Sequence, residues 1–91
     1  MAPQDATDAN SDPERARLLW QCRRGMLELD AMLQSFMERG YEELTPAGRK
    51  AFGMLLRAPD PLLLDYLMGH AVPIDPGVAD VARQIRRAAG P

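Results

Sequence analysis

Apolar residues recur along most of this chain at the three- and four-residue spacing of an amphipathic α-helix. The longest stripe comprises Met26, Leu29, Leu33, Phe36 and Met37. Three shorter stripes follow, made of Phe52, Leu55 and Leu56, then of Leu63, Leu64, Leu67 and Met68, and last of Val78, Val81, Ala82, Ile85 and Ala89. No stretch alternates with a period of two, and Val, Ile and Thr are scarce, so strands are not expected.

A capping-type residue directly followed by proline occurs four times, as Asp12-Pro13, Thr45-Pro46, Asp60-Pro61 and Asp75-Pro76. An Asp or Thr side chain accepts hydrogen bonds from the unpaired N–H groups of a first helical turn. Proline fits the next position because its missing N–H would be unpaired there anyway. These pairs therefore predict four helix starts.

Together the stripes and starts predict an all-α fold, a compact five-helix bundle with short connections. We expect helices near residues 13–24, 26–39, 46–57, 61–69 and 76–88, forming a single helical domain over residues 13–91 after a disordered tail at 1–12. Gly25 either separates the first two helices or kinks one long helix. The predicted core comprises Leu29, Leu33, Phe36, Phe52, Leu55, Leu56, Leu67, Val81 and Ile85.

Composition and charge exclude several classes of partner. The 91 residues suit one domain, and the net charge of −2 disfavours DNA or RNA, whose binding usually relies on a basic excess. The N-terminus lacks the basic and apolar regions of a secretion signal, and no apolar run approaches the roughly 20 residues that span a bilayer. We therefore expect a cytoplasmic protein with no nucleic-acid partner and no direct membrane insertion.

The residues that carry chemistry are few. Cys22 and His70 are the only cysteine and the only histidine, and neither belongs to a metal-ligand cluster or to a nucleophile–base pair. Cys22 lies among apolar helical positions, which predicts a buried and inert thiol. His70 follows Gly69 just past a predicted helix end, where a cation interacts favourably with the helix dipole. The chain is not expected to be an enzyme or to bind a metal.

The segment from Arg24 to Glu28, Arg-Gly-Met-Leu-Glu, is the most informative. Gly25 inside a helix would cost about 1 kcal/mol relative to alanine. Pairing of Arg24 with Glu28, four residues apart, would return only a few tenths of a kcal/mol. Two interpretations remain open: a turn that breaks the helix, or a glycine that lets the backbone of a partner approach between a cation and an anion.

At these residues the sequence resembles the FAD assembly factors of succinate dehydrogenase, the SdhE family, whose signature is Arg-Gly-x-x-Glu. The resemblance extends through Trp20-x-Cys22-Arg23-Arg24-Gly25-Met26, Glu28-Leu29-Asp30, Asp60-Pro61 and Leu67-Met68-x-His70, and covers about Arg15 to Arg86. Tyr66 departs from the family pattern, in which tryptophan is common; the exchange keeps a large amphipathic ring.

The resemblance implies a five-helix assembly factor that binds the flavoprotein subunit of succinate dehydrogenase, and in some bacteria fumarate reductase. It implies that FAD is attached covalently to a histidine of that partner; no cofactor is assigned to this chain itself, and whether it binds free FAD stays open. We expect a monomer when it is free. By analogy Arg24, Gly25 and Glu28 form the partner-binding site, and all three should be exposed. The alternative function is a toxin-neutralising binding module, because some family members carry an antitoxin label.

Overall fold

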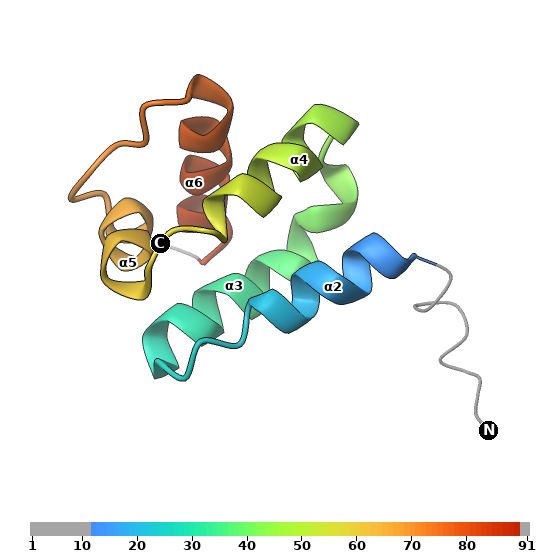
Figure 1. Ribbon diagram of the computed structural model, residues 1–91, viewed down its shortest axis with the longest axis horizontal. Helices are drawn as coiled ribbons and strands as arrows, with labels where there is room; N and C mark the ends of the chain where they lie inside the picture. Colours follow the sequence, from blue (N-terminus) through green and yellow to red (C-terminus); the bar gives the residue numbers. More distant parts are fainter. Residues whose placement is uncertain (1–11, 90–91) are drawn as a thin grey trace.

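The computed structural model describes residues 12–89. With the labels of Figure 1, its helices are α2 (Pro13–Gln21), α3 (Leu27–Arg39), the short 3-10 helix η1 (Tyr41–Glu43), α4 (Pro46–Leu55), α5 (Asp60–Met68) and α6 (Pro76–Ala88). This range contains no strand, so the predicted all-α fold with five α-helices is confirmed. None of these helices is long and apolar enough to cross a membrane.

Helix boundaries agree with the sequence prediction within one to three residues, and the largest difference is at the end of the first helix. That helix stops at Gln21 instead of residue 24, because the chain turns through the segment that contains Gly25. The turn η1 was not predicted. Residues 1–11 of the predicted tail lie outside the described residues, whereas Asp12 is the N-cap of α2.

Three of the four predicted caps are confirmed as side-chain hydrogen bonds. The side chain of Asp12 accepts from the Arg15 N–H at 3.1 Å, and that of Thr45 accepts from the Gly48 N–H at 3.0 Å. Asp75 accepts from two N–H groups at the start of α6, at 2.7 and 3.1 Å. Asp60 does not cap α5, and its carboxylate has a different partner, described below.

The core lies where α6 packs against α3, α4 and α5. All nine predicted core residues are buried, and the stripe of α6 contributes Val78, Val81, Ala82 and Ile85. Phe36 of α3 meets Phe52 of α4 edge-on, with ring centroids 5.3 Å apart. The ring centroid of Tyr41 in η1 lies 6.2 Å from that of Phe52. Three of the five aromatic rings therefore lie where α3, η1 and α4 meet.

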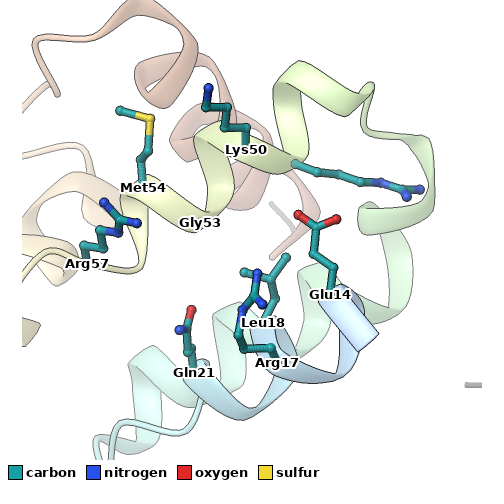
Figure 2. A pocket seen from close by; sticks show the side chains of 9 residues that line it. Glu14, Arg17, Leu18, Gln21, Lys50, Gly53, Met54 and Arg57 are labelled. Atoms are coloured by element: carbon teal, nitrogen blue, oxygen red, sulfur yellow. The ribbon is translucent and has the colours of Figure 1, made fainter. Parts of the chain in front are cut away.

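Helix α2 joins this core through Leu18, with Cys22 just after its end. Beside that contact, a partly open groove of about 330 Å³ runs between α2 and α4 (Figure 2). Arg17 and Glu14 extend from α2 toward α4 in this view. The residues that line this groove include Gln21, the last residue of α2.

Candidate functional site

The connection between α2 and α3 contains the predicted signature. Gly25 has a φ of +85°, a left-handed backbone conformation that residues other than glycine seldom adopt. Because α2 ends at Gln21 and α3 begins at Leu27, Gly25 separates two helices and does not kink one. Its conformation alone explains the choice of glycine, and a Cβ added there would meet no atom within 4 Å.

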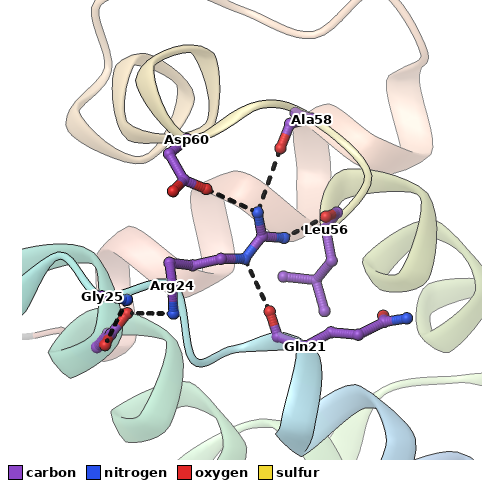
Figure 3. A network of polar contacts seen from close by, with 7 residues as sticks. Gln21, Arg24, Gly25, Leu56, Ala58 and Asp60 are labelled. Atoms are coloured by element: carbon purple, nitrogen blue, oxygen red, sulfur yellow. Dashed lines mark hydrogen bonds and ion pairs between the residues drawn. The ribbon is translucent and has the colours of Figure 1, made fainter.

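Arg24 differs from the prediction that its side chain lies free in solvent. The side chain is only 14% exposed and extends into the gap between α2 and the α4–α5 connection (Figure 3). Its Nη1 donates to Asp60 Oδ1 at 2.9 Å, and the pairing of Arg24 with Glu28 that was considered from the sequence does not form.

The remaining contacts of Arg24 explain why an arginine is buried here. The Nε group donates to the Gln21 carbonyl at 2.7 Å, and the two terminal nitrogens donate to the carbonyls of Leu56 and Ala58. Gln21 ends α2 and Leu56 follows the end of α4, so these carbonyls lack the usual helical partners. A planar guanidinium with five N–H donors satisfies several such groups at once and places positive charge at two helix C-termini.

Asp30, in the first turn of α3, holds the same loop from its other side. Its Oδ1 accepts the Arg24 N–H at 2.8 Å and its Oδ2 accepts the Gly25 N–H at 3.1 Å. Asp30 thus holds the backbone of Arg24, and Asp60 holds its side chain. Neither role was predicted from the sequence. An acidic residue shortly after a glycine break was the available signal for Asp30, whereas no neighbouring residue indicated that Asp60 would bind Arg24.

Gly25 and Glu28 are exposed, as predicted. Two large apolar side chains close to them in the sequence are also exposed, Trp20 with 70% of its surface and Leu27 with 86%. The guanidinium of Arg23 lies 5.7 Å from the Trp20 ring centroid. We call the set of Trp20, Gly25, Leu27 and Glu28 the loop surface. Exposed aromatic and aliphatic side chains beside a fixed loop are typical of a protein-binding surface.

His70 and Cys22, the two residues considered for chemistry, do not belong to the loop surface. His70 is 70% exposed just after α5, with its Nδ1 3.7 Å from Asp65 Oδ1. Cys22 is fully buried, which confirms the predicted location of its thiol. Burial raises the pKa of Cys22 from 9.0 to about 12, although nearby Arg24 favours the thiolate. Since the thiolate is the nucleophile, this residue is poorly suited to catalysis at neutral pH.

This raised pKa predicts a loss of stability in alkali. The folded thiol keeps its proton up to about pH 12, whereas the unfolded thiol ionises above about pH 9. The free energy of unfolding should therefore fall as pH rises past 9, by about 1 kcal/mol at pH 10 from Cys22. Denaturant melts at pH 8 and 10 measure it, and the Cys22→Ala variant should show a smaller fall. Rapid alkylation of Cys22 in the native protein at pH 8 would contradict this account.

Comparison with known proteins agrees with the site. A family model described as "Flavinator of succinate dehydrogenase" matches residues 16–89. Proteins named FAD assembly factor SdhE are similar over most of their length. That of Coxiella burnetii is 42% identical over 71 residues, 78% of this chain and 87% of that protein. That of Shewanella oneidensis is 43% identical over 76 residues, 84% and 93% of the two chains.

The relative from Legionella pneumophila (strain Paris) is 53% identical over 60 residues, 66% of this chain and 76% of that protein. These relatives are named as assembly factors and not as catalysts. The match of the family model includes all six residues from Gln21 to Met26 and both aspartates that hold the loop. The chain therefore belongs to the succinate dehydrogenase flavinator family.

Proposed function

We propose that this protein binds the flavoprotein subunit of succinate dehydrogenase and promotes covalent attachment of FAD to that subunit. The observation that carries the proposal is the family match over residues 16–89, supported by relatives named as FAD assembly factors. FAD is attached to the partner in this proposal, and the chain itself acts as a cytoplasmic monomer without a cofactor of its own.

The loop surface is the part of the molecule that we assign to the partner. Gly25 and Glu28 are exposed contact residues, and Leu27 and Trp20 offer apolar area beside them. Arg24 acts differently: its guanidinium is engaged within the chain, so it positions the loop and does not reach the partner through its charged group. Two aspartates and one arginine keep the loop in one conformation, which lowers the entropy lost on binding.

The mechanism is positioning. Attachment requires the flavin and a histidine of the partner to meet in a reactive geometry, and holding two groups in that geometry removes several kcal/mol from a barrier. An assembly factor that binds one conformation of the flavoprotein more tightly shifts the population toward it. No group of this chain needs to transfer a proton in such a mechanism.

A pulldown tests the identity of the partner. A tagged copy, expressed in cells that lack the native gene, should retain the succinate dehydrogenase flavoprotein as its main partner, and the Gly25→Arg variant should not. Retention of a toxin instead, with no flavoprotein, would favour the antitoxin alternative and contradict the proposal.

Glu28→Ala is expected to weaken flavoprotein binding by about tenfold or somewhat more. A carboxylate that becomes buried against a partner donor contributes about 1–3 kcal/mol, and about 1.4 kcal/mol corresponds to tenfold in affinity. Titration calorimetry with the isolated flavoprotein measures the change. Glu38→Ala is the matched control, because Glu38 is an exposed glutamate at the opposite end of α3. Equal affinities of the two variants would remove Glu28 from the interface.

A further inference from the structure

The groove between α2 and α4 concentrates positive charge on a chain whose net charge is −2. Its lining includes four cations, Arg17, Arg49, Lys50 and Arg57, and one carboxylate, that of Glu14. Like charges brought together at one groove raise the local concentration of an anionic ligand. None of these five charged residues takes part in the contacts that fix Arg24 or belongs to the loop surface, so neither explains the charge of the groove.

Three of the four cations are available to a ligand. The guanidinium of Arg49 already lies 4.7 Å from the Tyr41 ring centroid and 3.8 Å from Glu42 Oε1. Among residues 12–89, by contrast, no ion pair engages Arg17, Lys50 or Arg57. Arg17 extends from α2 toward α4 (Figure 2). Lys50 borders the groove from α4, with its side chain directed away from α2 in this view, and Arg57 borders it from just after the end of α4.

Between the cations the groove has an apolar floor, made by Leu18, Gly53 and Met54. Gly53 lies inside α4, where alanine would be more favourable for the helix. An added Cβ would sit 3.7 Å from Leu18 Cδ2, an ordinary contact, so packing does not demand glycine at this position. The missing side chain instead keeps the floor open to a ligand.

We propose that this groove binds an acidic segment of the flavoprotein subunit, with carboxylates near Arg17, Lys50 and Arg57 and an apolar side chain over Gly53. The proposal rests on the function proposed above and extends it to a second contact. Charge complementarity favours this occupant, and the mixed floor and rim suit a peptide that alternates acidic and apolar side chains.

Continuity with the loop surface is a second argument for the same partner. Gln21 lines the end of the groove, and its carbonyl accepts a hydrogen bond from Arg24. Arg57 lies between Leu56 and Ala58, whose carbonyls accept from the same guanidinium. A flavoprotein that covers the Gly25 loop is therefore expected to reach the end of the groove at Gln21.

Zero-length cross-linking tests the contact directly, because Lys50 is the only lysine of the chain. A carbodiimide activates a carboxylate, which then forms an amide with a neighbouring amine. In the complex with the isolated flavoprotein, mass spectrometry should find Lys50 joined to an Asp or Glu of the flavoprotein. Lys50→Arg keeps the charge but removes the amine, so this variant should lose that cross-link. A complex in which Lys50 forms no such cross-link would overturn the proposal.

Charge reversal gives the energetic test. The Lys50→Glu/Arg57→Glu variant should bind the flavoprotein about tenfold more weakly, with a shallower dependence of affinity on salt. The control is Arg83→Glu/Arg87→Glu, which makes the same change of charge on exposed residues of α6. If the control weakens binding equally, only the net charge matters and the groove proposal is wrong.

Two further outcomes separate the alternatives. A cross-link from Lys50 to Asp5 or Asp8 of the same chain would assign the groove to the chain's own N-terminal segment and overturn the proposal. The Gly25→Arg variant distinguishes failure of the groove from failure of the proposed function. If Gly25→Arg prevents binding while the groove variant binds like wild type, the proposed function stands and the groove proposal fails. If both variants bind normally, the assignment of the loop surface fails as well. If the wild-type chain itself does not bind the flavoprotein, the proposed function fails.

Discussion

Cells that carry only the Gly25→Arg variant are expected to contain succinate dehydrogenase flavoprotein without covalent FAD. Gly25 is exposed in the middle of the loop surface, and an arginine side chain would stand between this surface and the partner. In-gel flavin fluorescence of the flavoprotein measures the effect, with the amount of the variant checked by immunoblot. Normal fluorescence in this strain would contradict the assignment of the loop surface.

The effect of Gly25→Arg on stability needs its own control, because Gly25 has a left-handed backbone conformation. Inside a helix, a longer residue at this position would gain helix propensity, but Gly25 lies outside both helices at a φ of +85°. Any L-residue with a side chain should lose about 1–2 kcal/mol in this conformation. Gly25→Ala carries the same strain with its methyl group in open space. Retained flavinylation in Gly25→Ala, with loss in Gly25→Arg, isolates the effect of bulk; equal loss in both would assign the defect to the loop conformation.

Arg24→Ala is expected to lower the free energy of unfolding by about 2–4 kcal/mol and to impair flavinylation. The variant leaves the carbonyls of Gln21 and Leu56 and the carboxylate of Asp60 without their donor. Hydrogen bonds to charged groups contribute about 1.5–3 kcal/mol each, and those of a single guanidinium are not additive. Thermal and denaturant melts measure the stability, and the same fluorescence assay measures function.

Two variants separate the role of Arg24 in positioning from a direct contact. Arg24→Lys keeps the charge but lacks the planar fork, so it should recover only part of the stability. Asp60→Asn leaves the loop surface untouched yet weakens the hold on Arg24, and should lower the affinity for the flavoprotein modestly. Arg23→Ala is the matched control, since Arg23 is exposed and contacts Trp20. A melt of Arg24→Ala indistinguishable from that of Arg23→Ala would show that the buried contacts contribute little.

Most of the fold was predicted from interactions between residues that are close together in the sequence. A cap such as Asp12 or Asp75 acts on N–H groups two or three residues away, so the sequence contains both partners side by side. The apolar stripes likewise needed only helical periodicity to identify the buried side of each helix, and the predicted core from Leu29 to Ile85 is buried throughout.

The candidate site was predicted in part, because its contacts join distant segments. Asp60 has the sequence of a cap, but its partner Arg24 lies 36 residues away, and only the packing of α2 against the α4–α5 connection brings the two together. For the same reason the sequence placed Arg24 at the surface. At Gly25 the interpretation as a turn between two helices is confirmed by the left-handed backbone. The approach of a partner at this glycine stays a prediction, and a Cβ added there would meet open space.

Covalent FAD formation with purified components tests most directly whether this protein promotes flavinylation. Isolated flavoprotein lacking covalent FAD is incubated with free FAD, with and without this protein, and flavin fluorescence is measured after denaturing electrophoresis. We predict that fluorescence on the flavoprotein increases with the wild-type chain in proportion to the complex formed, and stays at the unassisted level with Gly25→Arg. An equal rate of attachment with and without the wild-type chain, under conditions in which the two proteins bind, would contradict the account.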